Sequence, residues 1–538
     1  MATNTIATVD FIIIGAGSAG CVLANRLSEN PANKVLLLEA GVPDKKMEIG
    51  IPAAYGNLHR SNVDWGFSTE PQKHINNRRI YLPRGKTLGG SSSTNAMAYV
   101  RGNHADYDQW AAQGNEGWTF KQLLPYFKKS EFNEDITNDF HGNGGELNVT
   151  FQKTFQTPYA RAFVEACKEN GIPENNDYNG THQTGVGMFQ FTIRNGRRHS
   201  TATAFLKPAL QRPNLRVITQ ARVLQILIDG NRATGVEYLT AGKNPRKVYA
   251  AKEIILSAGA FQSPQLLLLS GIGDGETLNA QGIAVKKELP GVGNNLQDHL
   301  FFPVSCLSEQ QAGFNHHLKP LNQVADLLNY MVTHKGIMTC SPLEAVAFLS
   351  INGESAINLQ LHFAPIHLGD DEKANLYDPK TFPTQDGFSI LPTLLKPKSR
   401  GYVALRSANP LDDPLIQPNF LAEADDLKIL LDGAKKALAI FNANAFDPYR
   451  RLISAPMDQT DAGIIAHIKK YVETVYHPVG TCKMGNDAMA VVNDRLQVHG
   501  FDGLRVVDAS VMPTIVSGNT NAPVIMIAEK ASDMILSF

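Results

Sequence analysis

Residues able to bind a phosphate group stand close to the N-terminus. Gly15, Gly17 and Gly20 match the pattern GxGxxG, and Glu39 follows about 20 residues further on. In this pattern the glycines permit a tight turn and a close approach of the backbone to a pyrophosphate, while the acid holds ribose hydroxyls. The spacing therefore predicts a dinucleotide site. Glu39 would repel a 2′-phosphate, which disfavours NADP, but the pattern does not distinguish NAD from FAD.

Residues able to move a proton stand near the C-terminus. His477 precedes Pro478, which favours an extended backbone at the histidine. Asn519 lies in a polar turn that leads into an apolar run. A neutral histidine beside a fixed amide can accept a proton and hold a substrate oxygen. The chain has 15 histidines, so the local pattern alone does not single out His477.

A third candidate is the run of small residues at 84–95. Its residues 85–87 are similar to the end of a phosphate-binding P-loop, but Ile80 stands where that motif requires glycine. Small residues expose many amide groups, which could lie against a planar ligand and donate to its anionic parts. A flexible surface linker is an equally good interpretation of this composition.

Local patterns predict the elements that would position these residues. Residues 9–14 form an apolar, β-branched run typical of a buried parallel strand. A helix over 21–27 and a second strand over 34–38, which ends at Glu39, complete a βαβ dinucleotide-binding unit. Further strands are predicted at 215–219, 223–228, 253–257 and 504–508, and further helices at 110–129, 263–269 and 524–536.

The pattern changes between residues 305 and 464, where proline, histidine and asparagine increase. Residues 359–363 and 402–405 alternate between polar and apolar, which predicts an antiparallel sheet that forms the substrate wall. We therefore expect an α/β (α+β) two-domain fold, with a Rossmann-like cofactor domain and a substrate domain. The predicted boundaries are 1–155, 195–305 and 465–538 for the cofactor domain, and 156–194 and 306–464 for the substrate domain.

Composition excludes several other classes. The 538 residues carry 50 Lys and Arg against 51 Asp and Glu, so no global basic field exists to gather nucleic acid. The five cysteines form no CxxC pair, and HExxH and GxSxG are absent, which argues against a disulfide framework, a metal site and a serine hydrolase. Without a secretory signal or a long apolar run, we expect a cytoplasmic protein. A peripheral contact at the inner face of the membrane stays open.

Taken together, these segments resemble the glucose–methanol–choline (GMC) family of flavin oxidoreductases. Three stretches carry the resemblance: 15–20 with Glu39, 84–102, and 259–273. The run from His477 to Asn519 is also similar to the family. Within the family, the chain is most similar to choline-dehydrogenase-like and aliphatic-alcohol dehydrogenases.

The resemblance implies FAD as the cofactor. Some relatives attach FAD through a histidine, and Thr94 stands in that place here, so the resemblance implies non-covalent binding. His477 matches the catalytic histidine of the family and Asn519 matches its partner. The residues that the resemblance assigns to the cofactor are Gly15, Gly17, Ser18, Ala19, Gly20, Glu39, Ala40, Trp65, Arg84, Leu88, Gly90, Ser91, Asn95, Ala96, Ala98, Val223, Ala258, Asp508, Ala509 and Thr520.

The resemblance also implies a reaction. His477 would take the hydroxyl proton of a primary alcohol, Asn519 would orient the oxygen, and hydride would pass to flavin N5. The electrons would go to a quinone or another acceptor that is not NAD. The alternatives are an oxidase that uses oxygen, a hydroxynitrile lyase on the same fold, and a flavoprotein without catalysis.

Two further residues bear on the substrate. Ala364 stands where photochemical decarboxylases of the family carry a cysteine, which argues against that activity. Glu344 could hold the cation of choline, although a structural role is the favoured interpretation.

Overall fold

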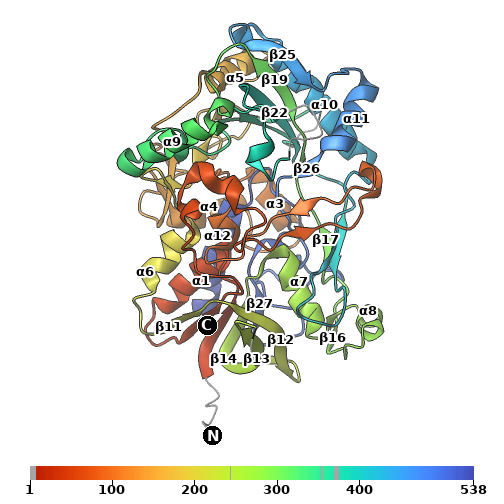
Figure 1. Cartoon of the computed structure of the whole chain (residues 1–538). Coiled ribbons are helices and arrows are strands. Elements are labelled where there is room, and N and C mark those ends of the chain that lie inside the picture. The colour runs from red at the N-terminus through yellow and green to blue at the C-terminus, as the bar shows by residue number, and fades with distance from the viewer. Residues whose placement is uncertain (1–7, 243, 352, 354–355, 369–374, 538) are drawn as a thin grey trace.

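Two large sheets organise the protein, one near each end of the molecule (Figure 1). The computed structural model describes residues 8–242, 244–351, 353, 356–368 and 375–537. The chain crosses between the two sheets several times, so each sheet is built from segments far apart in the sequence.

The first sheet has seven strands in the order β11-β2-β1-β14-β13-β12, with β27 also paired to β14. Strands β11, β2, β1, β14 and β27 run parallel, whereas β12 and β13 are antiparallel to their neighbours. Its strands are β1 (Thr8–Ile14), β2 (Val35–Leu38), β11 (Leu215–Ile218), β12 (Ala221–Asp229), β13 (Arg232–Thr240), β14 (Arg246–Leu256) and β27 (Leu504–Val506). The βαβ unit predicted from residues 9–39 is confirmed, and burial explains its continuous apolar strands.

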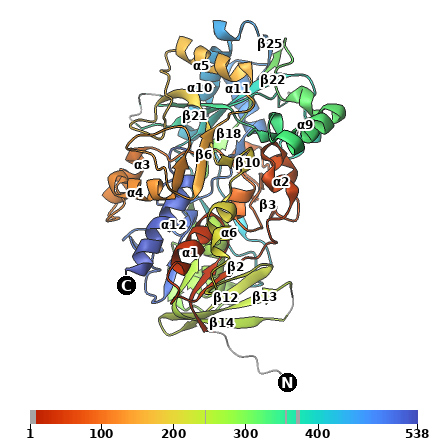
Figure 2. The ribbon, with the colours of Figure 1, turned by 90° about the vertical axis from the view of Figure 1, so that its left-hand side faces the viewer.

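Both ends of the chain contribute to this layer. Helix α1 (Ser18–Ser28) packs beside helix α12 (Asn521–Leu536), as Figure 2 shows. Arg26 joins the two helices, because its Nε and Nη2 donate to the carboxylate of Glu529 at 2.9 and 2.7 Å. Helix α7 (Gly259–Leu269) follows β14 directly.

The second sheet has eight strands in the order β25-β19-β22-β21-β20-β7, with β18 and β26 at one side. All of its pairs are antiparallel, which confirms the sheet type predicted for this region. Its strands are β7 (Gly185–Met188), β18 (Leu300–Phe301), β19 (Val304–Ser308), β20 (Ala345–Leu349), β21 (Leu359–Ala364), β22 (Gly387–Leu394), β25 (Arg450–Ala455) and β26 (Glu473–Thr474). Helices α5 (Pro158–Glu169), α10 (Ala424–Phe441) and α11 (Asp461–Tyr471) accompany it.

The exact domain boundaries stay a prediction. Strands β18 and β26 lie in segments assigned to the cofactor domain, and they pair at the edge of the second sheet. Residues 300–301 and 473–474 therefore form one of the links between the two layers. His477, the candidate base, follows this link by three residues.

Two predicted elements differ from the structure. The helix expected over 110–129 is two helices, α3 (His104–Ala112) and α4 (Phe120–Ser130), because Gly114 and Gly117 adopt positive φ angles of 94° and 83° between them. The strand expected at 402–405 is β23 (Gly401–Ala404), which belongs to a separate sheet with β17 (Asn294–Leu296) and β24 (Leu415–Gln417). Pairing with residues far away in sequence decides this placement.

The remaining α-helices and strands are short, except for the 14-residue helix α9. They are α2 (Met47–Gly50), α6 (Lys207–Ala209), α8 (Gly275–Ala280), α9 (Pro320–Thr333), β3 (Phe67–Ser68), β4 (Tyr81–Leu82), β5 (Glu131–Asn133), β6 (Leu147–Phe151), β8 (Gln190–Phe191), β9 (Ile193–Arg194), β10 (Arg197–Arg198), β15 (Ile272–Gly273) and β16 (Lys287–Glu288). Among the described helices, none combines the length and apolarity needed to cross a bilayer. The five cysteines are buried and unpaired.

Candidate active site

A cavity of about 630 Å³ is lined by residues of both large sheets. From the first sheet it meets Ile14, Leu38 and Ser257, which lie at or just beyond the carboxyl ends of parallel strands. From the second sheet it meets His362 and Leu391. Ligands of doubly wound sheets bind at this edge of the parallel strands, so the cavity stands where the fold predicts a cofactor.

Three helices begin beside the cavity. The first amide of α7, Gly259, donates to Asp508 Oδ2 at 2.9 Å, whereas the first amides of α1 and α12 have no such partner among the described residues. Helix α1 begins after Gly17, α7 after Ala258 and α12 after Thr520, and none of these three N-cap residues makes a side-chain cap bond. These three residues line the cavity. Uncapped amides and the positive ends of helix dipoles form a favourable site for an anion such as a pyrophosphate.

Close backbone contacts explain the glycines of this region. A Cβ on Gly15, whose φ is +98°, would lie 2.5 Å from the carbonyl oxygen of Ser257. A Cβ on Gly90 would lie 2.7 Å from Cα of Gly17. The run of small residues at 84–95 therefore packs onto the turn after β1, and this contact argues against the surface-linker interpretation.

Polar contacts hold the cavity-facing part of that run. Ser93 Oγ donates to the carbonyl oxygen of Leu88 at 2.7 Å. Arg198 Nη1 donates to Asn95 Oδ1 at 2.7 Å, so a buried guanidinium orients the asparagine amide. Thr94, Asn95 and Ala96 line the cavity in this fixed conformation.

Glu39 lies in the wall of the cavity at the end of β2. Its carboxylate accepts hydrogen bonds from the amides of Ala16 and Gly41, each at 2.7 Å. Burial raises the pKa of Glu39 to about 7, although both amides oppose that shift. A carboxylate held in this way has remaining lone pairs that can accept ribose hydroxyls.

The structure brings most predicted site residues to one cavity. The predicted residues that line it are Gly15, Gly17, Ser18, Ala19, Glu39, Ala40, Trp65, Arg84, Gly90, Ser91, Asn95, Ala96, Ala98, Val223, Ala258, His477, Asp508, Ala509, Asn519 and Thr520. Gly20 and Leu88 are outside the lining. Gly20 serves helix packing, since a Cβ there would lie 1.9 Å from the Gly15 oxygen, and Leu88 belongs to the hydrophobic core.

At the other end of the cavity His477 contacts two side chains. Its Nε2 atom lies 3.4 Å from Asn519 Nδ2, and its Nδ1 atom lies 3.0 Å from Nδ1 of His299. His299 Nε2 lies 3.1 Å from the carbonyl oxygen of Leu395. These contacts place the candidate base between an amide and a second histidine.

The same contacts determine the tautomer of His477. A carbonyl oxygen only accepts, so neutral His299 carries its proton on Nε2 and donates it to Leu395. Its Nδ1 atom is then an acceptor, which requires His477 to carry its proton on Nδ1. The Nε2 atom of His477 then carries the lone pair, which accepts a long hydrogen bond of 3.4 Å from Asn519 Nδ2.

Burial keeps both histidines neutral. It lowers the pKa of His477 well below the usual value, and nearby His299 lowers that pKa further. It also lowers the pKa of His299 to about 3. A neutral imidazole with a free lone pair is the form of histidine that accepts a proton.

Asp298 fixes the backbone of the histidine loop. Its Oδ1 accepts from the amide of His477 at 2.7 Å, and its Oδ2 accepts from Thr474 Oγ1 at 2.5 Å. Tyr476 adopts a positive φ of 64°, and its carbonyl oxygen accepts from Arg84 at 2.5 Å. The loop is thus held from both sides of His477.

Sequence reasoning missed Asp298, His299 and His362. The first two stand together before the apolar residues 300–302, which is the only local signal, because their partners are far away in sequence. His362 lines the cavity, and its Nδ1 lies 2.9 Å from Thr393 Oγ1. Its buried Nε2 has no hydrogen-bond partner among the described residues. Burial lowers the pKa of His362 to about 3, so this ring is also neutral.

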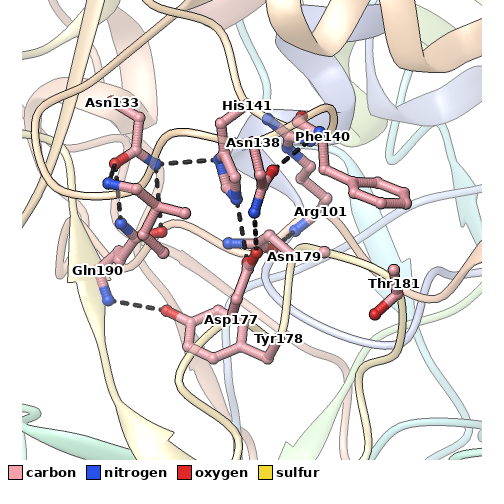
Figure 3. Close-up of polar contacts among 12 residues, drawn as sticks. Arg101, Asn133, Asn138, Phe140, His141, Asp177, Tyr178, Asn179, Thr181 and Gln190 are labelled. Atoms are coloured by element: carbon pink, nitrogen blue, oxygen red, sulfur yellow. Dashed lines mark hydrogen bonds and ion pairs between the residues drawn. The ribbon is translucent and has the colours of Figure 1, made fainter.

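A buried charge network surrounds Arg101, six residues after the small-residue run, and Figure 3 labels three of its members, Arg101, His141 and Asp177. Arg101 Nη2 donates to Glu131 at 2.7 Å, and both side chains are fully buried. His141 lies between Glu131 and Asp177, with ring nitrogens 3.0 Å from each carboxylate. Burial lowers the pKa of His141, but the hydrogen bonds to Asp177 and Glu131 outweigh it and raise the pKa overall.

The sequence is similar to known flavin-dependent oxidoreductases, in agreement with a cofactor site in this cavity. Two models of the GMC oxidoreductase family match residues 9–301 and 397–528. An alcohol dehydrogenase [acceptor] of Pseudomonas putida is 43% identical over 535 residues, covering 98% of this chain and 95% of that protein. A mitochondrial choline dehydrogenase of Mus musculus is 42% identical over 539 residues, covering 98% and 89%.

Solved structures agree as well. A pyridoxine 4-oxidase from Mesorbium loti is 30% identical, with a TM-score of 0.88 and coverage of 98% of this chain and 99% of that one. A formate oxidase from Aspergillus oryzae RIB40, studied for its FAD modification, is 29% identical, with a TM-score of 0.92 and coverage of 99% and 98%. The chain belongs to the GMC oxidoreductase family and is an FAD-dependent enzyme.

Proposed function

We propose that the protein oxidises an uncharged primary alcohol to the aldehyde and passes the electrons to an acceptor other than NAD. The observation that carries this proposal is the unprotonated Nε2 atom of His477 in the cavity wall, which has Asn519 Nδ2 as its hydrogen-bond partner at 3.4 Å. A base beside an amide donor suits removal of a hydroxyl proton and stabilisation of the resulting oxygen.

Residues of this chain fit FAD from one end of the cavity to the other. The free amides after Gly17 and Thr520 would hold the pyrophosphate, and Glu39 the adenosine ribose. Two buried oxygens in the cavity wall, Ser257 Oγ and Asn519 Oδ1, have no hydrogen-bond partner among the described residues. When bound, FAD supplies the acceptor for the hydride of the alcohol carbon. A threonine at position 94 supports non-covalent binding.

His477 and Asn519 would act on the substrate oxygen in different ways. His477 Nε2 accepts the hydroxyl proton, while the Nδ1 proton stays hydrogen-bonded to His299. The Asn519 amide donates to the oxygen as negative charge develops on it. The unpartnered Nε2 of His362 offers a further acceptor for a polar group of the substrate.

The lining of the cavity favours an uncharged alcohol over choline. Among the described lining residues the only acids are Glu39, Asp508 and Asp326. The first two lie at the cofactor end, and Asp326 is hydrogen-bonded to His317 Nδ1 at 2.7 Å. The substrate half is mostly apolar, with Phe301, Phe314, Met338, Leu343, Ile366 and Leu391 in its wall.

Glu344, the candidate partner for a choline cation, is hydrogen-bonded to Thr157 instead of facing the cavity. Its carboxylate accepts from the amide and the hydroxyl of Thr157 at 3.0 and 2.5 Å, and it is outside the cavity lining. Burial raises the pKa of Glu344 to about 7, so its negative charge is weakened at neutral pH. Both observations support a structural role for this residue.

An anaerobic titration tests the proposal. The purified yellow protein is mixed with hexanol, benzyl alcohol or choline while the flavin absorbance at about 450 nm is followed. We expect bleaching by the uncharged alcohols and little by choline. Fast recolouring when oxygen is admitted would assign an oxidase, and slow recolouring a dehydrogenase. No bleaching by any alcohol, with flavin bound, would overturn the proposal in favour of a lyase or a non-catalytic flavoprotein.

A further inference from the structure

Helix α9 (Pro320–Thr333) turns its apolar side chains toward the solvent. Five large apolar residues recur along it at helical spacing and share its outer face. Their exposed fractions are Leu321 86%, Val324 59%, Leu328 62%, Met331 57% and Val332 83%. A helix of a water-soluble surface normally shows the opposite arrangement, so this face is adapted to contact something apolar.

The inner face of α9 is fastened to the protein by polar contacts. Asp326 accepts from His317 Nδ1 at 2.7 Å, and Asn322 Nδ2 donates to the carbonyl oxygen of His316 at 2.8 Å. Tyr330 is buried, and its hydroxyl donates to the carbonyl oxygen of Gly196 at 3.3 Å. A different face of α9 therefore makes its contacts with the protein, and the apolar outer face takes no part in packing against the core.

The helix projects from the molecule, and part of it lines the active-site cavity. Figures 1 and 2 both show α9 standing out at the periphery, in views that differ by 90°. Gln323 and Asp326 of the helix line the cavity, as do Leu318 before it and Met338 after it. A surface that covered α9 would lie next to this part of the cavity wall.

Cations surround this apolar face. Lys319 and Lys335 are exposed at the two ends of the helix, and Arg194 and Arg197 are exposed on the hairpin that contacts its C-terminal end. Among the described residues, none of these four side chains takes part in an ion pair. The helix itself contains a single acid, Asp326, which His317 already binds.

We propose that α9 lies in the interface of a lipid bilayer, with Leu321, Leu328 and Val332 among the acyl chains and the flanking cations against anionic headgroups. An apolar face with a cationic border is typical of helices that lie in a membrane surface. At 14 residues the helix is about 21 Å long, too short to cross a hydrocarbon core of about 30 Å.

A second copy of the chain is the competing occupant. Two α9 helices packed face to face about a two-fold axis would bring their cationic ends together in either orientation, because both ends carry lysine. That repulsion disfavours a homodimer through this face. Anionic headgroups have the complementary charge.

The test is flotation of the FAD-loaded protein with lipid vesicles. Vesicles of phosphatidylcholine are compared with vesicles that also contain phosphatidylglycerol. We expect binding to the anionic vesicles that weakens at high salt. The variant Leu321→Asp/Val332→Asp should bind roughly tenfold more weakly per substitution, and neither residue lines the cavity. Hydrogen exchange should show protection of residues 320–333 only when vesicles are present.

A matched variant controls for hydrophobicity alone. Met457 is 81% exposed on a different surface element, so Met457→Asp should leave vesicle binding unchanged. Equal loss in this variant, or no binding of the parent protein to anionic vesicles, would overturn the proposal. Sedimentation that shows a dimer dissociated by Leu321→Asp/Val332→Asp would assign the face to a second copy. None of these readouts depends on alcohol turnover, so they remain decisive if the proposed activity fails.

Discussion

The Nδ1 atoms of His299 and His477 lie 3.0 Å apart, and only one of them carries a proton. The carbonyl oxygen of Leu395 fixes the proton of His299 on Nε2, and the proton between the rings therefore belongs to His477. This assignment frees His477 Nε2 to act as a base. A backbone carbonyl directly after β22 thus sets the tautomer of the proposed base in the cavity wall.

Removal of the base should abolish most turnover. We expect His477→Ala to retain FAD, since other residues bind the cofactor, and to lose about 10²–10⁴-fold in kcat. The measurement is steady-state turnover normalised to flavin content. Near-normal kcat in the flavin-loaded variant would contradict the assigned role.

Removal of the orienting histidine should have a smaller effect. His299→Leu leaves the Nδ1 proton of His477 without its acceptor, so we expect about a 10–100-fold loss in kcat. His299→Asn offers an oxygen near the lost nitrogen and should recover part of the activity. Equal activity in the two variants would mean that His299 acts only through packing.

The pH profile should reflect a base with a lowered pKa. Burial and His299 lower the pKa of His477 well below 6.5, so its neutral, active form predominates at neutral pH. We expect kcat/KM for an uncharged alcohol to be flat near neutral pH and to fall only in acid, as His477 takes a proton. An acid limb centred above about 6.5 would show that another group controls the rate.

The close contact between Gly90 and Gly17 can be tested by a substitution that adds one methyl group. Gly90→Ala adds a Cβ 2.7 Å from Gly17 Cα, so we expect loss of most bound FAD with the fold retained. Gly230→Ala is the matched control, because Gly230 has a similar φ of +55° and no atom within 4 Å of the added Cβ. Flavin absorbance per chain, with circular dichroism as the fold measurement, distinguishes the two.

Stability should vary with pH through His141. Its pKa is raised in the folded protein, so its stabilising contribution is complete below about 6.5 and is lost as pH rises through the raised pKa. The pKa values of Glu131 and Asp177 are lowered, so their contribution is present near neutral pH and is lost in acid. Urea unfolding of His141→Gln should therefore show its largest deficit in mildly acidic solution. A deficit that grew at alkaline pH would be incompatible with this network.

Removal of the Glu131 carboxylate should lower the free energy of unfolding more than removal of the His141 ring. Glu131→Gln leaves the fully buried Arg101 without its counter-charge, for which we expect a destabilisation of about 3–5 kcal/mol. Urea unfolding at neutral pH measures it. A change below about 1 kcal/mol would show that Asp177 or solvent compensates the guanidinium.

The cofactor end of the molecule was predictable because its signals are local. The strand, glycine turn, helix and acid from residue 9 to Glu39 lie next to one another in the sequence. Most of the 22 predicted site residues came instead from the family resemblance, and 20 of the 22 line the cavity. The contact between His299 and His477 was not predictable, since the two residues are 178 positions apart and meet only in the folded chain. The exposure of the apolar face of α9 was not predictable either, because the sequence alone does not show which side of a helix packs against the core.

The pairing of β27 with β14, and the packing of α12 beside α1, have a consequence for biosynthesis. Residues 504–536, which include β27 and the helix that begins after cavity-lining Thr520, are synthesised more than 240 residues after β14. A nascent chain can fold its early segments but lacks part of the cavity wall until residues 504–536 have been synthesised. We therefore expect capture of the flavin to require that these residues have left the ribosome.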